Sequence, residues 1–280
     1  MISFTFPNDF FNIRDSLECG QIFRFSPFEK GFLVFSLDKC AYCYEQGDFV
    51  IIECEDADKA YFEHFFDLEN DYSVIVDSAI SFGVDMLSRA ATLGKGVRIF
   101  NQDPLETLFS FIISQNNNIP RIKGIIERLC VSLGEPKSFM GKTFYTFPTA
   151  HKMAEQGVEF FKSIGLGYRA EYVRKLAVDV DLGLDVYSFQ TLDTQTLKAR
   201  LMALYGVGPK VCDCVSLFGF HRTDSFPVDT WIDKVYRDNF NGTLVNRVKV
   251  AEWFVNQFGE RSGYYQQYLF YFKRSFENRV

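Results

Sequence analysis

The spacing of apolar residues changes partway along this chain of 280 residues, and the change predicts two kinds of structure. From Gly31 to Cys54, apolar and polar residues alternate in short runs rich in aromatic and β-branched side chains. Such alternation is typical of an antiparallel sheet. After Gly94-Lys95-Gly96 the apolar residues follow helical spacing. We therefore predict an α+β fold: an N-terminal antiparallel sheet domain with a few helices over residues 1–96, and a larger all-helical domain over residues 97–280.

Local signals place the helices of the second part. Asp103 is a typical N-cap, Pro104 suits the first helical position, and Glu106 stands where a capping box needs its acidic partner. A second helix is predicted from Pro120, with an apolar stripe that continues to Leu129. Further helices are predicted near residues 149–162, 169–179, 194–204, 209–219, 229–239, 246–258 and 263–276.

The composition is that of an ordinary soluble protein, 47% hydrophobic and 24% charged. No apolar run approaches the ~18 to 20 residues of a membrane-spanning helix, and the N-terminus lacks a signal-peptide pattern. Seven cysteines form an odd set without the spacing of a disulfide framework, which fits a reducing compartment. We expect a cytoplasmic protein without a membrane segment, and the compact chain without targeting extensions suggests a prokaryote.

The charge is distributed unevenly. The net charge of −6 argues against nucleic acid as a partner, because DNA binding neutralises phosphates with Lys and Arg. However, residues 1–100 hold 8 Lys and Arg against 17 Asp and Glu, a balance of −9, whereas residues 101–280 hold 22 against 19, a balance of +3. The second part therefore permits DNA binding, but charge alone does not decide the question.

The most informative stretch begins at Leu197 and ends at Asp229. A helix near 194–204 is followed by Gly206-Val207-Gly208, a tight turn that glycines favour, and Pro209 opens the next helix. The predicted helix-hairpin-helix, at about 194–219, presents backbone N–H groups and a helix N-terminus to solvent, which suits a phosphate. A plain helical hairpin without a ligand would show the same turn.

Three side chains near the hairpin suit chemistry on a sugar. Lys210 lies in the first helical turn, where a cation is locally disfavoured and a neutral, nucleophilic amine is favoured. Cys214, four residues on, lies on the same helix face, and Asp229 follows in Phe226-Pro227-Val228-Asp229, where its carboxylate suits an oxocarbenium-like sugar. Each also has an ordinary interpretation: a surface lysine, a small buried thiol and a helix N-cap.

At these residues the chain resembles the helix-hairpin-helix superfamily of DNA glycosylases, whose signature joins a Leu-x-Gly-Val-Gly hairpin, a catalytic lysine and a downstream Val-Asp. Within that superfamily it is similar to the 8-oxoguanine DNA glycosylases over nearly its whole length. The segments that carry the resemblance are Ser16-Leu17-Glu18-Cys19-Gly20-Gln21-Ile22-Phe23-Arg24, Ser114-Gln115-Asn116-Asn117-Asn118-Ile119-Pro120-Arg121-Ile122, Gly165-Leu166-Gly167-Tyr168-Arg169-Ala170, and Gln266 with Phe270.

The resemblance implies a role for the residues of the damaged-base pocket. Gly20 would accept the N7 hydrogen of 8-oxoguanine with its carbonyl oxygen, and Gln266 would bind the Watson–Crick edge. Phe270 and Cys214 would sandwich the ring. Lys210 would attack C1′, and Asp229 would stabilise charge on the sugar; β-elimination through the Schiff base would then cut the strand on the 3′ side.

The resemblance also implies contacts with double-stranded DNA. Asn116 would fill the hole left by the flipped base, Tyr168 would wedge the stack, and Arg121 with Arg169 would bind the estranged cytosine. Gly206, Val207 and Gly208 would bind phosphate. We expect preference for 8-oxoguanine opposite cytosine, and a monomeric enzyme.

Two residues depart from the family pattern. Tyr205 stands where many relatives have proline in the hairpin, and Trp231 stands where many have a histidine that contacts a phosphate. We interpret both as a weakened or rerouted phosphate contact, not as a loss of activity.

No cofactor is required by this interpretation. Cys40-x-x-Cys43 lacks a second ligand pair, which disfavours zinc, and no cysteine follows Cys214, which excludes the iron–sulfur loop of the endonuclease III branch. A monovalent cation on the hairpin carbonyls is a further expectation. Two other functions stay open: an alkylpurine glycosylase that uses water and has no lyase step, which Lys210 disfavours, and a non-catalytic DNA-binding protein that keeps the hairpin.

Overall fold

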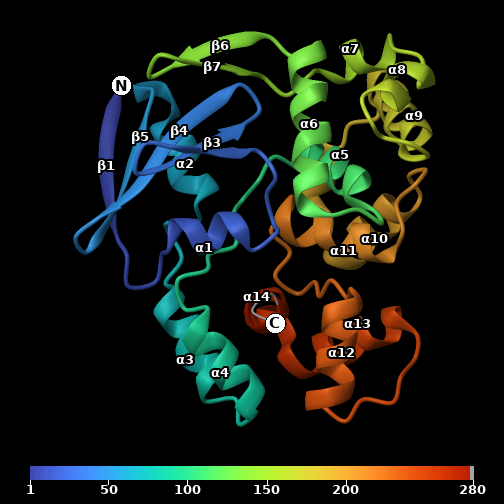
Figure 1. The fold of residues 1–280 in the computed structure, drawn as a ribbon. Helices are drawn as coiled ribbons and strands as arrows, with labels where there is room; N and C mark the ends of the chain where they lie inside the picture. Colours follow the sequence, from blue (N-terminus) through green and yellow to red (C-terminus); the bar gives the residue numbers. More distant parts are fainter. Residues whose placement is uncertain (278–280) are drawn as a thin grey trace.

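The computed structural model describes residues 1–277, with an antiparallel five-stranded sheet followed by a mostly helical region (Figure 1). The strand order is β1-β5-β4-β3-β2, so that only β1 leaves the sequential order by pairing with β5. This arrangement confirms the predicted α+β fold class. The strands are β1 (Ile2–Pro7), β2 (Phe25–Phe28), β3 (Gly31–Ser36), β4 (Lys39–Gln46) and β5 (Phe49–Cys54).

The sheet buries side chains on both of its faces. Cys43 packs in one apolar cluster with β5 residues, while Cys40 packs in another with the β6–β7 hairpin. Residues three apart in a strand point to opposite faces, so these two thiols do not form a chelating pair. Within residues 1–277, no group of three or more His, Cys, Asp or Glu side chains is arranged to hold a metal ion.

The helices take up most of the remaining chain. In order they are α1 (Ile13–Glu18), α2 (Lys59–Phe65), α3 (Tyr72–Ile80), α4 (Asp85–Leu93), α5 (Pro104–Ser114), α6 (Ile119–Leu133), α7 (Ala150–Ala154), α8 (Val158–Ser163), α9 (Arg169–Asp181), α10 (Thr194–Met202), α11 (Pro209–Phe218), α12 (Thr230–Asn239), α13 (Arg247–Phe258) and α14 (Ser262–Glu277). A short hairpin of β6 (Pro136–Phe139) and β7 (Lys142–Tyr145) joins α6 to α7. Among the described residues, no helix is both long and apolar enough to cross a membrane.

Most helix predictions agree with the structure, and one cap differs. The Asp103 side chain accepts a hydrogen bond of 2.8 Å from the backbone N–H of Glu106, as an N-cap should. The Glu106 carboxylate does not serve as the expected capping-box partner. It is buried, lies 3.2 Å from the Arg24 guanidinium and accepts a 2.6 Å bond from the Leu37 backbone N–H. This ion pair links α5 to the sheet.

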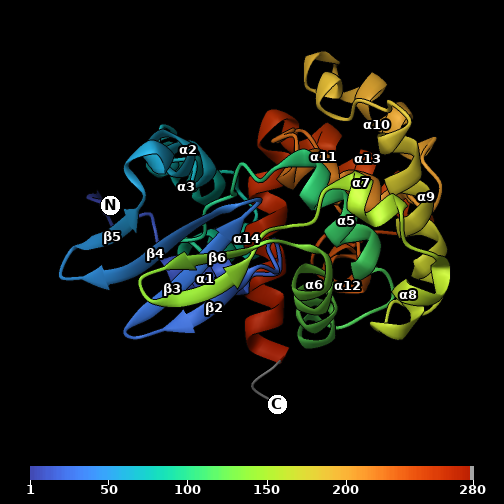
Figure 2. The same ribbon diagram turned by 90° about the horizontal axis from the view of Figure 1, so that it is seen from above.

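Helix α14 joins the two parts of the molecule. In Figure 2 it runs between the sheet, with α1, α2 and α3 on the same side, and the helices of the later part of the chain, such as α5, α6 and α9. Helices α3 and α4, which precede residue 96, share the large apolar cluster with α14 and with the helical region. The sheet keeps a second apolar cluster of its own. The domain boundary at residue 96 stays a prediction, and the chain just after α1 enters the helical core through Cys19 and Phe23.

Candidate active site

One pocket gathers residues from five distant parts of the chain. It lies between the loop after α1, helix α5, helix α11, the segment before α12 and helix α14. The predicted catalytic and base-recognition residues Gly20, Lys210, Cys214, Asp229, Gln266 and Phe270 all line it, together with Cys19, Phe111, Phe218, Pro227 and Gln267. The structure therefore brings together residues that are up to 250 positions apart.

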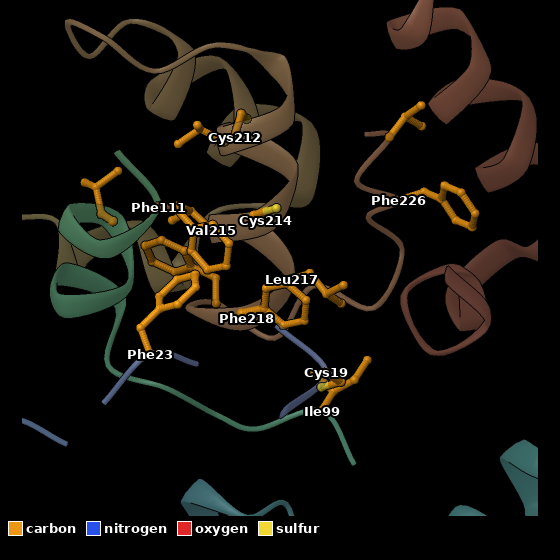
Figure 3. Packing of buried hydrophobic residues seen from close by; sticks show 14 of the residues in the cluster. Cys19, Phe23, Ile99, Phe111, Cys212, Cys214, Val215, Leu217, Phe218 and Phe226 are labelled. Atoms are coloured by element: carbon orange, nitrogen blue, oxygen red, sulfur yellow. The ribbon is translucent and has the colours of Figure 1, made fainter. Parts of the chain in front are cut away.

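The pocket has an aromatic wall. The Phe111 ring stacks on Phe218 with centroids 5.6 Å apart and contacts Phe23 edge-on at 5.5 Å. Figure 3 shows these three rings gathered beside α11, near Cys214. A wall of this kind suits a planar ring and excludes water from one side of the site.

Lys210 reaches the pocket from the first turn of α11. Gly208 is the N-cap of this helix and Pro209 is its first residue, as predicted. The Lys210 ammonium lies 5.3 Å from the centre of the Phe111 ring, and its charge acts on the Cys214 thiol. Burial raises the pKa of Cys214 to about 11, against the opposing effect of the Lys210 charge. The thiol is therefore neutral near pH 7, which disfavours Cys214 as a nucleophile.

Asp229 faces the same pocket from the start of α12. One oxygen of its carboxylate accepts hydrogen bonds of 2.9 Å from the backbone N–H groups of both Trp231 and Ile232. The predicted N-cap is thus confirmed. These bonds fix the carboxylate beside the pocket that Lys210 enters, so a residue with a structural role is also positioned for chemistry.

Gln266 has an unsatisfied acceptor inside the pocket. Its side chain is buried and its Nε2 donates a 3.1 Å hydrogen bond to the Pro227 carbonyl oxygen. Its Oε1 is buried without a partner among the described residues. A buried acceptor without a donor costs free energy, so this oxygen is ready for a donor on a ligand. Its neighbour Gln267 donates to the Cys19 carbonyl oxygen at 3.3 Å and fastens the loop that carries Gly20.

Gly20 occupies a backbone conformation that favours glycine. Its φ is +93°, and a Cβ atom at this position would lie 3.6 Å from both Phe270 and Ile119. The loop therefore brings backbone, not a side chain, close to the Phe270 ring, which leaves the space between them open to a ligand.

The predicted duplex-contacting residues form a second group outside this pocket. Asn116 has a φ of +46°, and its Nδ2 donates a 3.1 Å hydrogen bond to the Tyr168 hydroxyl. Asn116, Arg121 and Tyr168 are exposed, whereas Arg169 is buried. The Arg169 guanidinium donates to the carbonyl oxygens of Leu166, Gln115 and Asn116. Arg121 donates to the Gly165 carbonyl oxygen at 3.3 Å.

Gln115 is a residue that the sequence did not single out. Its Nε2 donates a 2.9 Å hydrogen bond to the Gly206 carbonyl oxygen, and its own carbonyl oxygen accepts from Arg169. Gln115 thereby joins the hairpin to the loop that carries Asn116. The sequence feature that could have indicated Gln115 is its position directly before three asparagines, at the end of a buried helix.

The hairpin requires glycine at position 206 for two reasons. The φ of Gly206 is +86°, and a Cβ atom there would lie 2.4 Å from Cγ of Tyr172. Because Cγ belongs to the base of a ring, the neighbour cannot move aside cheaply.

Gly206→Ala is therefore expected to destabilise the fold by about 3 kcal/mol, from backbone strain together with the steric clash. The measurement is urea unfolding, and the control is Gly47→Ala, because Gly47 has a φ of +60° but no atom within 4 Å of the added Cβ. Equal losses in the two variants would show that the Tyr172 clash contributes nothing.

Comparisons with known proteins identify the family of the chain. Residues 3–108 match the family model described as 8-oxoguanine DNA glycosylase, N-terminal domain, and residues 109–245 match the model described as HhH-GPD superfamily base excision DNA repair protein. A probable N-glycosylase/DNA lyase of Methanothermobacter thermautotrophicus is 32% identical, over 75% of this chain and 71% of that protein. The N-glycosylase/DNA lyase of Arabidopsis thaliana is 34% identical, over 63% of this chain and 52% of that protein.

Solved structures extend the likeness over nearly the whole chain. The structure of MBOgg1 with a low affinity DNA ligand has a TM-score of 0.93 and 34% identity, covering 98% of this chain and 96% of that one. The 8-oxoguanine glycosylase/lyase of Clostridium acetobutylicum, with double-stranded DNA containing cytosine opposite 8-oxoG, has a TM-score of 0.91 and 33% identity, covering 97% and 94%. The chain belongs to the 8-oxoguanine DNA glycosylase family, within the helix-hairpin-helix superfamily of base excision DNA repair proteins.

Proposed function

We propose that this chain removes 8-oxoguanine opposite cytosine from double-stranded DNA and then cleaves the strand as a lyase. The observation that carries the proposal is the single pocket that holds an amine, a carboxylate and a buried free acceptor, from Lys210, Asp229 and Gln266. The family supports it, because its member from Clostridium acetobutylicum binds DNA that contains cytosine opposite 8-oxoG.

In the proposed mechanism, the deprotonated amine of Lys210 attacks C1′ of the flipped nucleotide. The bond from C1′ to the base breaks, and the base leaves with the bonding electrons and takes up a proton. Asp229 stabilises the positive charge that develops on the sugar during this step. The nitrogen then loses a proton and forms a Schiff base with C1′, as the bond from C1′ to the ring oxygen O4′ breaks and O4′ takes up a proton. The Schiff base acidifies the 2′ hydrogen, and loss of that proton expels the 3′ phosphate by β-elimination.

Recognition of the base follows from the groups in the pocket. The Gln266 amide would pair with the Watson–Crick edge, and its Oε1 would gain the hydrogen-bond donor that it lacks among the described residues. The Gly20 carbonyl would accept from N7–H, which 8-oxoguanine has and guanine lacks. Phe270 and Cys214 line the same pocket and would hold the ring between them.

On the surface that faces the duplex, we assign Asn116 to the space that the flipped base leaves. The Tyr168 ring would wedge into the neighbouring base stack. Arg121 and Arg169 would bind the estranged cytosine. The Arg169 guanidinium has to exchange some of its carbonyl partners at Gln115 and Asn116 for the cytosine, because those carbonyls hold it in the DNA-free structure. We assign this exchange to DNA binding.

The hairpin residues Gly206, Val207 and Gly208 would hold a phosphate through backbone N–H groups. Neutral carbonyl oxygens in the same turn suit a monovalent cation better than a divalent one, since no carboxylate accompanies them. The Gly206 carbonyl oxygen already accepts from Gln115, and the Leu204 carbonyl oxygen accepts from the Val207 N–H at 3.1 Å, which leaves each with one further lone pair. A cation there would order the turn, and no chemical step depends on it. We also propose that the chain acts in the cytoplasm of a prokaryotic cell; the archaeal relative supports this assignment.

Single-turnover excision tests the proposed substrate. We expect fast release of 8-oxoguanine opposite cytosine, slower release by at least about tenfold opposite adenine, and no release of guanine from an undamaged duplex. The loss opposite adenine arises because the guanidinium donors are then left unpaired. Equal rates of release opposite cytosine and opposite adenine would show that Arg121 and Arg169 do not recognise cytosine.

A further inference from the structure

Three tyrosines form a continuous row beside the hairpin. The rings of Tyr168 and Tyr172 meet edge-to-face with centroids 5.8 Å apart, and those of Tyr172 and Tyr205 meet in the same way at 5.1 Å. Tyr172 is half-buried between the other two. The outer members are exposed, Tyr168 by 49% and Tyr205 by 53%. The row is therefore a continuous set of ring contacts whose two outer rings are exposed to solvent.

The two ends of this tyrosine row belong to surfaces that both face DNA in the proposed function. Tyr205 lies in the turn between α10 and α11, directly before Gly206, whose backbone packs against the Tyr172 ring. At the other end, the Tyr168 hydroxyl is bonded to Asn116. The row thus connects the proposed phosphate-binding turn, Gly206 to Gly208, to the loop that carries Asn116. Tyr205 is the exposed ring at the end of the row beside this turn.

The charge distribution of the protein points to a role for the tyrosine row in DNA binding. Residues 101–280 have a charge balance of only +3, which limits the neutralisation of phosphates by Lys and Arg, and the hairpin would bind phosphate with neutral backbone groups. Exposed aromatic rings supply affinity that does not depend on counterion release, since they pack on sugars and bases. A phenol hydroxyl can also donate to a phosphate oxygen.

We propose that Tyr205 is a DNA-contact residue, whose ring packs on the deoxyribose next to the phosphate held by the hairpin. The ring is fixed in advance by Tyr172, so that little side-chain freedom is lost on binding. This inference deepens the proposed function and rests on it, because it assigns a further contact with the same duplex. It adds an aromatic contact at the position where many relatives have proline in the hairpin.

The test compares Tyr205→Ala, Tyr205→Phe and Tyr205→Pro by fluorescence anisotropy, with an undamaged duplex and a duplex that carries a non-cleavable abasic analogue. The control is Phe49→Ala, which removes an aromatic side chain of similar exposure, 45%, from β5 in the N-terminal sheet. Tyr205→Pro guards against misfolding, since many relatives carry proline there. Thermal unfolding of each variant is recorded in parallel.

We expect Tyr205→Ala and Tyr205→Pro to bind about tenfold more weakly, with an unchanged slope of log Kd against log salt because no cation is lost. Tyr205→Phe and Phe49→Ala should bind within about twofold of the wild type. The inference is overturned if Tyr205→Ala binds as the wild type does, or if Tyr205→Phe is as weak as Tyr205→Ala, which would leave only a hydroxyl contact. If the proposed function fails, wild type releases no base, yet the comparison of affinities still reports on Tyr205.

Discussion

Lys210→Gln is expected to lower the rate of 8-oxoguanine release by at least about 10³-fold, since it removes the proposed nucleophile. Among the described residues, no other amine lines the pocket. Lys210 is exposed, so the variant should fold normally. Glutamine is one atom shorter than lysine, and its neutral amide is not a nucleophile. Affinity for the duplex should change by no more than about tenfold, because only one charge is lost.

Lys249→Gln provides the matched control for this variant. Lys249 also lies in the first turn of a helix, α13, and is exposed, but it does not line the pocket. The control should excise at the wild-type rate. If Lys210→Gln releases the base at a rate within about tenfold of the wild type, Lys210 is not the nucleophile. Direct attack by water would then be favoured.

Asp229→Asn is expected to lower the single-turnover rate of base release by about 10²- to 10³-fold, because it removes the charge that stabilises the sugar in the transition state. Asparagine is as good an N-cap as aspartate, so it can still accept from the N–H groups of Trp231 and Ile232. The midpoint of thermal unfolding should therefore stay within about 2 °C of the wild type. A loss of rate without a loss of stability separates the chemical role of Asp229 from its capping role.

Asp193→Asn is the companion measurement. Asp193 caps α10 by accepting a 2.9 Å hydrogen bond from the Thr196 N–H, and it does not line the pocket. This variant should keep both its stability and its rate of excision. If Asp193→Asn slows excision as much as Asp229→Asn does, the effect is one of overall charge, and the proposed contact with the sugar is wrong.

The sequence was sufficient wherever the determining interactions are local. The hairpin follows from two glycines and a proline within four residues, and the Asp103 and Asp229 caps follow from their own helices. The alternation of residues in β4 already separates Cys40 from Cys43. The placement of Gly20 and Gln266 in one pocket depends on contacts across almost the whole chain, and no local pattern predicts it; only the family resemblance did.

Long-range polar contacts account for what the sequence did not predict. Glu106 has the spacing of a capping-box residue, but its partner Arg24 lies 82 residues away in sequence and is invisible to a local pattern. Gln115 likewise bonds to Gly206, 91 residues on. The β6–β7 hairpin was missed because its strands are four residues long and rich in charged and polar groups.

Borohydride trapping tests the central claim most directly, because it detects the covalent bond between the enzyme and C1′. The wild type and Lys210→Gln are each incubated with a duplex that carries one 8-oxoguanine opposite cytosine, and the reductant is then added. We predict a covalent protein–DNA complex with the wild type and none with Lys210→Gln. Base release by the wild type without any trapped complex would contradict the Schiff base, and neither release nor trapping would contradict the substrate as well.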